Sequence, residues 1–384
     1  METDKYFGLS KRIARWKEPS EFESMLSIAA ENNPIAKKLY IEYYRHLNED
    51  YYKRGQFIAQ KLIEQNHSDL KGIDSETLYE DMVYCLHKYG LSFQDYIVYD
   101  LYNKSEYCRS QFVSDKLRYY YYDILNAPYV DNMLTDKYIC YQEYGVFYKR
   151  DVVPVIKPND KSQFLKFTEK NKHFIFKPLK DHSGHGVTLV KTNSIDPNIW
   201  FDQVISETPG VAEEVIIQGA ELNKINPCSV NTCRIVTFTI NNEVIIIGGA
   251  LRMGVGESIT DNAGSGGIFA SINTTNGILQ SDAKNYHNVH YFAHPTTKQQ
   301  IIGYELPKWN EAIELTKMMA THKKGTTLIS WDIAYSEKGW CMVEANANGI
   351  WDLMQSNLQI GLKQDLYDLM DKYFEFIKRN PEKI

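Results

Sequence analysis

Three side chains with oxygen donors stand in two consecutive apolar stretches near the C-terminal end of the sequence. Asp332 precedes a turn at residues 336–339, and Glu344 and Asn346 follow it. Side chains alternate along a strand, so Glu344 and Asn346 share one face. Oxygen-only ligands favour Mg²⁺ or Mn²⁺, and Mg²⁺ usually takes one or two carboxylates and leaves its other positions to water and phosphates. These residues therefore indicate metal-assisted binding of a nucleotide.

The hairpin register decides whether the two carboxylates meet. A three-residue loop that ends at Gly339, in the left-handed region, pairs Ser336 with Trp340. The same register sets Asp332 directly opposite Glu344. Facing residues have Cβ atoms roughly 4.5–5.5 Å apart, and like charges there destabilise a sheet, so the pair asks for a cation. The alternative is an exposed hairpin with a solvated acidic face, which its many apolar residues disfavour.

Composition narrows the class of protein. A chain of 384 residues exceeds the usual size of a single core, so two or three structural units are expected. The net charge of −6 argues against a nucleic-acid binder. The six cysteines form no C-x-x-C pair, which disfavours a zinc knuckle and fits a reducing compartment. No signal-peptide pattern and no run of about 18 apolar residues occurs, so we expect a cytoplasmic protein without a membrane span.

The texture of the sequence changes along the chain. Residues 1–130 read mainly as amphipathic helices rich in tyrosine, whose rings are more often packing than a ligand site. From about residue 173, β-branched strands alternate with Gly and Asn turns. Expected strands cover residues 173–178, 187–191, 211–218, 233–240 and 243–251, the last two joined by an Asn-Asn turn, and expected helices cover residues 307–322 and 361–379.

A glycine-containing loop at residues 181–186 lies between two expected strands. Glycines there let backbone N–H groups approach phosphate oxygens, and Lys177 and Lys180 nearby add charge-assisted contacts. The alternative is an ordinary hairpin turn. No P-loop, complete Rossmann glycine pattern or kinase motif is present, which makes a P-loop or doubly wound enzyme unlikely on the motifs alone.

The order of these features over about residues 130–360 resembles the ATP-grasp superfamily, and more narrowly its sugar-transfer associated branch, whose members occur with surface-polysaccharide genes. The segments that carry the resemblance are Thr135-Asp136-Lys137, Phe176-Lys177-Pro178, the loop at 183–186, Glu213-Glu214-Val215-Ile216, residues 230–237 with Asn231 and Arg234, Leu251-Arg252 with Asp261-Asn262 and Gly266-Gly267, and Asp332 with Glu344-Ala345-Asn346.

The resemblance implies an α+β chain with the ATP-grasp fold, in which two α+β subdomains with antiparallel sheets clasp ATP behind a helical N-terminal region. The implied boundaries are a helical region at 1–130 with a substrate-related role, an N-terminal subdomain with the phosphate lid loop at 131–212, and a C-terminal subdomain with the metal site at 213–384.

The resemblance also implies roles for individual residues. The implied nucleotide-binding residues are Lys137, Lys177 and Lys180 for phosphates, Ser183, Gly184, His185 and Gly186 for the lid, Glu213, Glu214, Val215 and Ile216 for the adenine hinge, and Glu221 for the ribose. The implied magnesium ligands are Asp332, Glu344 and Asn346, and the implied catalytic residues are Arg234, Arg252 and Asn231.

Structural alternatives exist for several of these roles. Lys137 is equally consistent with a plain first residue of a helix, and Arg252 with an ordinary ion pair. Glu213 and Glu214 alternate in direction, so only one of them points inward. His182 and His185 depart from the more glycine-rich lid of typical members, which leaves the closing geometry of this loop open.

The implied activity is an ATP- and Mg²⁺-dependent carboxylate–amine ligase that acts through an acyl phosphate, with two Mg²⁺ ions and Mn²⁺ as a possible substitute. The implied partners are a small-molecule or glycan-linked carboxylate, such as an acidic sugar, and an amine, such as an amino acid, in capsule or other surface-polysaccharide biosynthesis. The segment at 261–267 and the N-terminal region are expected to shape the substrate pocket. The alternatives are a kinase of the same fold and a nucleotide-binding protein without catalysis. The oligomeric state stays open.

Overall fold

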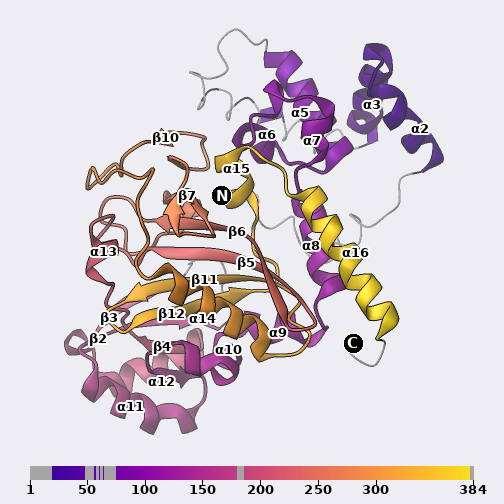
Figure 1. Cartoon of the computed structure of the whole chain (residues 1–384). Coiled ribbons are helices and arrows are strands. Elements are labelled where there is room, and N and C mark those ends of the chain that lie inside the picture. Colours follow the sequence, from indigo (N-terminus) through magenta and orange to yellow (C-terminus); the bar gives the residue numbers. More distant parts are fainter. Residues whose placement is uncertain are drawn as a thin grey trace. The chain divides into compact units, whose positions relative to one another are not determined.

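The computed structural model describes residues 20–47, 56–57, 60, 64, 75–179 and 186–380 (Figure 1). The chain divides into two compact units. Unit 1 comprises Met1–Tyr121, His287–Val289 and Leu358–Asp368, and unit 2 comprises Tyr122–Tyr286, His290–Asn357 and Leu369–Ile384. Among the described residues, no helix combines the length and the apolar character that crossing a bilayer requires.

Every secondary-structure element in the described part of unit 1 is helical, as the sequence predicts. These elements are α2 (Glu21–Ala30), α3 (Pro34–Leu47), α5 (Ser75–Tyr89), α6 (Phe93–Val98), η2 (Leu101–Asn103), α7 (Glu106–Ser110) and the beginnings of α8 (Asp115–Leu125) and α16 (Lys363–Arg379). Asp81 joins its own helix, α5, to three others. Its carboxylate pairs with Lys37 of α3 at 2.6 Å and with Arg109 of α7 at 2.8 Å, and it accepts from the hydroxyl of Tyr96 of α6. Most of residues 48–74, within the region that the sequence predicts to be helical, lie outside the described residues.

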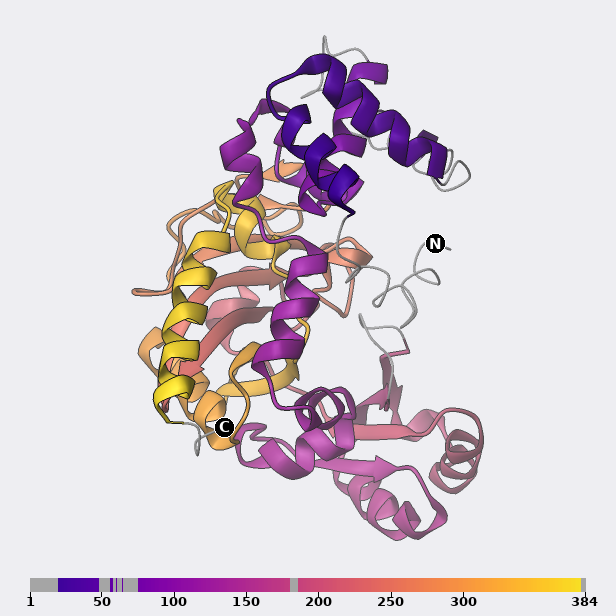
Figure 2. The same cartoon turned by 90° about the vertical axis from the view of Figure 1, so that its right-hand side faces the viewer.

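The first half of unit 2 is a four-stranded antiparallel sheet with two helices on one face (Figures 1 and 2). Its elements are β1 (Val152–Val155), β2 (His173–Pro178), β3 (Thr188–Lys191), β4 (Gly210–Glu214), α11 (Lys161–Lys170) and α12 (Pro197–Glu207), with the strand order β1-β4-β2-β3. Alternate residues such as Phe174 and Ala212 pack against Phe164 and Phe201 of the helices. The intervening side chains of β2 and β4 therefore point to the opposite face.

The second half of unit 2 is a larger antiparallel sheet with the order β10-β9-β7-β6-β5-β11-β12. Its strands are β5 (Thr232–Ile240), β6 (Glu243–Met253), β7 (Ile268–Asn273), β8 (Ile278–Leu279, paired with β7), β9 (Ala283–Lys284), β10 (His290–Tyr291), β11 (Leu328–Ser336) and β12 (Gly339–Asn346). The associated helices are α9 (Tyr129–Thr135), α10 (Lys137–Tyr144), α13 (Ala220–Asn223), α14 (Trp309–His322), α15 (Asp352–Leu358) and the later part of α16. Trp331, Ile333 and Met342 are fully buried in its core. The side chain between Trp331 and Ile333 on β11 therefore points to the other face of the sheet.

Several sequence predictions are confirmed in detail. Strand β2 has the predicted bounds, and the long hairpin of β5 and β6 turns at Asn241 and Asn242, which have φ values of 51° and 66°. The strand expected at residues 211–218 is shorter than predicted, since β4 covers only Gly210–Glu214. Beyond that point the chain leaves the small sheet, and Gln218 forms an isolated antiparallel bridge with Ser336 of the larger sheet.

Candidate active site

The hairpin of β11 and β12 brings the two predicted carboxylates together. Asp332 pairs directly with Glu344 and Ser330 pairs with Asn346, which confirms the expected pairing. The predicted turn register is wrong, because Ser336 pairs with Gly339 and not with Trp340. Gly339 does have the expected left-handed conformation, with φ at 84°.

A β-bulge reconciles the different turn with the confirmed pairing. The register shifts between Asp332 and Ile333, whose partners are Glu344 and Met342. Val343 is therefore the extra residue of β12. A bulge of this kind moves all later residues by one position along the strand. Without it, the turn that the structure has would set Asp332 opposite Val343, and the two carboxylates would lie on different faces.

Asp332 is fully buried and is held by two arginines. Arg234, its partner on β5, donates from Nε to Oδ1 at 2.9 Å and from Nη2 to Oδ2 at 2.8 Å. Nη2 of Arg252 lies 3.0 Å from Oδ2. Burial raises the pKa of Asp332, but the charges of Arg234 and Arg252 outweigh burial and hold this pKa below its usual value.

The pKa of Glu344 is shifted in the opposite direction, above its usual value. Burial of its carboxyl group is the largest cause of a raised pKa, and the charge of Asp332 and a hydrogen bond to Asp332 raise it further. Asn346 follows on the same face, and its Nδ2 atom is buried without a hydrogen-bond partner among the described atoms.

These side chains fit a divalent cation. All three offer oxygen donors, and a carboxylate oxygen that accepts an N–H retains a further lone pair. A cation beside Asp332 and Glu344 would favour the ionised form of Glu344, which the present surroundings oppose. The unpaired atom of Asn346 is Nδ2, which is a hydrogen-bond donor, so the atom that Asn346 would offer to a cation is Oδ1.

A second charged cluster lies on the small sheet. Nζ of Lys177, on β2, lies 3.0 Å from Oε2 of Glu213, on β4, and Nη2 of Arg150 lies 2.8 Å from the same oxygen. Burial raises the pKa of Glu213, but Lys177 and then Arg150 lower it to about 2. Glu214 points the other way and pairs with Lys338 at 3.0 Å. Of the two adjacent glutamates, only Glu213 is buried, as the alternation predicts.

The predicted hinge residues Val215 and Ile216 lie where the chain passes from the small sheet to the larger one. Directly after them, the carbonyl of Ile217 accepts from the N–H of Glu337 at 3.0 Å. Glu221 is exposed at the start of α13. Lys137 is the first residue of α10, which Asp136 caps by accepting from two backbone N–H groups. Their nucleotide-binding roles stay predictions.

The remaining predicted residues differ in what the structure says of them. Lys180, Ser183, Gly184 and His185 lie outside the described residues. Gly186 is described and has a left-handed φ of 72°.

Asn231 is fully buried. Its Nδ2 donates to Oε1 of Gln218 at 3.0 Å and to the carbonyls of Asn226 and Leu222. These contacts tie a loop together, and the catalytic role of Asn231 stays a prediction.

The segment around Asp261 supports one of the arginines. Oδ2 of Asp261 accepts from the N–H and the hydroxyl of Thr232, and Arg252 donates to that hydroxyl at 2.7 Å and 2.9 Å. Asp261 is itself buried. It therefore contacts Arg252 through Thr232 and also directly, with Oδ2 lying 3.6 Å from Nε of Arg252.

Sequence reasoning missed Arg150. This residue precedes β1 in no recognised motif, yet its side chain is only 3% exposed and contacts both sheets of unit 2. No local pattern reveals this role, because the partners of Arg150 are Glu213 and backbone carbonyls of residues 342–343.

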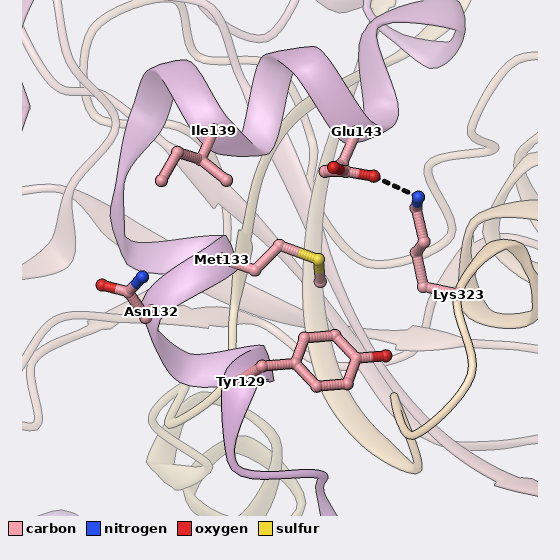
Figure 3. A pocket seen from close by; sticks show the side chains of 6 residues that line it. All are labelled: Tyr129, Asn132, Met133, Ile139, Glu143 and Lys323. Atoms are coloured by element: carbon pink, nitrogen blue, oxygen red, sulfur yellow. Dashed lines mark ion pairs between the residues drawn. The ribbon is translucent and has the colours of Figure 1, made fainter.

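A pocket of about 360 Å³ opens elsewhere in unit 2 (Figure 3). Its lining residues are Tyr129, Asn132 and Met133 of α9, Ile139 and Glu143 of α10, and Lys323 after α14. An ion pair joins Glu143 to Lys323. None of the predicted site residues lines it.

The model of a family described as sugar-transfer associated ATP-grasp matches residues 102–369, which is more than half of the chain. A search of curated proteins gave no match.

Similar solved structures include an N5-carboxyaminoimidazole synthetase from Staphylococcus aureus complexed with ADP (10% identity, TM-score 0.36, 60% of this chain and 51% of that chain). They also include a D-alanine-D-alanine ligase from Helicobacter pylori (15% identity, TM-score 0.36, 62% of this chain and 58% of that chain). A RimK domain protein ATP-grasp from Sphaerobacter thermophilus has 11% identity and a TM-score of 0.36, with 62% of this chain and 68% of that chain covered. The match to the first of these spans about half of that structure's length.

Proposed function

The chain belongs to the sugar-transfer associated ATP-grasp family, and on that premise we propose that it is an ATP- and Mg²⁺-dependent ligase that joins a carboxylate to an amine. The chain has the ATP-grasp fold of this family, with two antiparallel sheets in unit 2. The observation that carries the proposal is the facing pair Asp332 and Glu344, with Asn346 on the same face. Arg234 and Arg252 lie against this pair, and the small sheet adds the ion pair of Lys177 with Glu213.

ATP is proposed to bind between the two sheets of unit 2. Lys137 and Lys177 would contact its phosphates, where an ammonium suits an anionic oxygen. Residues 213–216 would contact adenine through their backbone, and Glu221 the ribose. The loop at residues 183–186 would cover the terminal phosphates.

Asp332, Glu344 and Asn346 would hold the Mg²⁺ ions, or Mn²⁺ in their place. When bound, the metal neutralises phosphate oxygens and so lowers the cost of bringing a second anion to the γ-phosphorus. The chain's own part is to keep Asp332 ionised, which Arg234 and Arg252 do in the structure.

The proposed reaction has two steps. A substrate carboxylate oxygen attacks the γ-phosphorus, the bond to the β-phosphate oxygen breaks, and an acyl phosphate and ADP form. A substrate amine then attacks the acyl carbon, phosphate leaves with the bonding pair, and the amine loses a proton to give an amide. Arg234 and Arg252 lie beside the candidate metal ligands, where a guanidinium fork suits a transferred phosphoryl group. Such catalysis depends on positioning and charge, and needs no nucleophilic side chain.

The substrates are proposed from the family description alone. An association with sugar transfer favours an acidic sugar, free or glycan-linked, as the carboxylate and an amino acid or aminated sugar as the amine. The product would enter surface-polysaccharide biosynthesis, and ATP supply favours the cytoplasm as the site of reaction.

The test is ADP formation by the purified chain with Mg·ATP and pairs of acidic sugars and amines. The proposal expects ADP and phosphate to appear together only when both a carboxylate and an amine are present. Amine-independent ADP formation with the γ-phosphate label retained on the product would instead identify a kinase. If the chain binds ATP but forms no ADP with any of the carboxylate and amine pairs tested, the result would favour the non-catalytic alternative.

A further inference from the structure

Arg150 bridges the two sheets of unit 2 through a single buried guanidinium. Its Nε and Nη2 donate to Oε2 of Glu213 at 3.0 Å and 2.8 Å. Its Nη1 donates to the carbonyl of Met342 at 2.6 Å, and Nη2 lies within a longer 3.4 Å of the carbonyl of Val343. One side chain therefore contacts the Lys177 partner on β4 and the backbone of β12.

The two carbonyls belong to the β12 bulge. Val343 is the extra residue, and Met342 is the first paired residue on its turn side. At a bulge the ladder is disrupted, so backbone groups need other partners, and a buried carbonyl without one is costly. Arg150 supplies those donors at the residue directly before Glu344.

We propose that Arg150 is a positioning residue: by holding the carbonyls of Met342 and Val343, it fixes the bulge that sets Glu344 opposite Asp332. The same guanidinium fixes Glu213 beside Lys177. Arg150 thereby ties the geometry of the candidate metal ligands to that of the candidate phosphate lysine. This inference rests on the proposed function, because its consequence is tighter binding of a metal–nucleotide complex.

A lysine at this position could not hold Glu213 and the two bulge carbonyls at the same time. Its ammonium is a single point charge on a flexible stem, whereas the planar guanidinium donates in several fixed directions at once. Lys338 and Glu214 provide the internal comparison, because they also join the two sheets but form an exposed ion pair that does not contact the bulge carbonyls. Exposed pairs of this kind contribute little to stability.

The experiment measures Mn²⁺ binding by electron paramagnetic resonance in the presence of β,γ-imido-ATP. Arg150→Lys keeps the charge beside Glu213 and loses the fork. Arg150→Met removes the guanidinium altogether, and Glu213 keeps its ion pair with Lys177, so its buried carboxylate is not left unpaired. The matched control is Lys338→Gln. Thermal melts establish that each variant is folded.

Losing a residue that orients a metal ligand typically weakens metal affinity by about 10- to 100-fold, and we expect that loss in both Arg150 variants but not in Lys338→Gln. Hydrogen–deuterium exchange should quicken at the amides of residues 342–344. In a steady-state assay, added Mg²⁺ should restore much of the turnover of Arg150→Lys, which a generally disordered protein would not show.

If the wild type binds Mn²⁺ and both Arg150 variants bind it as tightly as Lys338→Gln, the proposed role of Arg150 is overturned. The proposed function would then remain intact. Absence of Mn²⁺ and nucleotide binding by the wild type would instead overturn the proposed function, and the inference with it.

Discussion

Asp332 faces Glu344 across β11 and β12, and the pKa of Asp332 is lowered whereas that of Glu344 is raised. The difference arises because Arg234 and Arg252 lie against Asp332, while Glu344 has burial and the charge of Asp332 against its ionised form. The pair is electrostatically unequal, and substitutions at its two members should have different consequences.

Replacing Glu344 by glutamine should abolish turnover without weakening the fold. The amide keeps the size of the side chain and removes the unfavourable contact between like charges. We expect ADP formation to fall by about 100-fold or more, as for loss of a group that stabilises transition-state charge. The thermal midpoint should stay equal or rise. A clear drop in the midpoint would show that the ionised carboxylate stabilises the fold.

Replacing Asp332 by asparagine should destabilise the protein strongly. This change leaves Arg234 buried without its counter-charge, and breaking a buried ion pair from one side costs about 3–5 kcal/mol. Urea unfolding of Asp332→Asn beside Glu344→Gln makes the comparison. Equal stabilities of the two variants would contradict the inequality of the pair.

Acid stability should depend on Glu213. Its pKa falls from 4.5 to about 2 on folding, so its contribution is fully present above pH 4.5 and is lost as the pH falls towards about 2. The shift corresponds to about 3 kcal/mol at neutral pH. Unfolding free energies of wild type and Glu213→Gln should therefore differ at pH 6 and converge near pH 2. A constant difference at all pH values would refute this linkage.

Asp261 should affect catalysis through Arg252. Its carboxylate accepts from the hydroxyl of Thr232, which in turn accepts from Arg252, and its Oδ2 lies 3.6 Å from Nε of Arg252. We expect Asp261→Ala to lower kcat while leaving the KM of the amine substrate unchanged, with Asp261→Asn intermediate. A rise in that KM at constant kcat would favour the role in shaping the substrate pocket that the sequence suggests.

Local signals predicted much of this fold. The Asn-Asn turn defined the hairpin of β5 and β6 because both residues tolerate positive φ, and a short apolar run followed by a loop defined β2. The facing of Asp332 and Glu344 was predicted through a turn register that the structure does not have. The bulge at Val343 shifts the pairing by one residue and so restores the predicted pair, and the residue type of Val343 does not predict a bulge.

Tertiary contacts account for what the sequence did not reveal. Arg150 matters because it reaches Glu213 and the carbonyl of Met342, and the latter is 192 residues away in the chain. Asn231 was assigned a catalytic role through the resemblance carried by residues 230–237, although its described contacts are those of a buried loop amide. Of the lid residues, Ser183, Gly184 and His185 lie outside the described part of the chain, and the roles of all of them, Gly186 included, stay predictions.

The most direct test of the central claim is the number of Mn²⁺ ions bound in the presence of β,γ-imido-ATP, compared between wild type and Glu344→Gln. We expect two nucleotide-dependent ions in the wild type and a loss of binding in the variant. Equal Mn²⁺ binding by the two proteins would show that the metal is held elsewhere and would contradict the assignment of Asp332, Glu344 and Asn346.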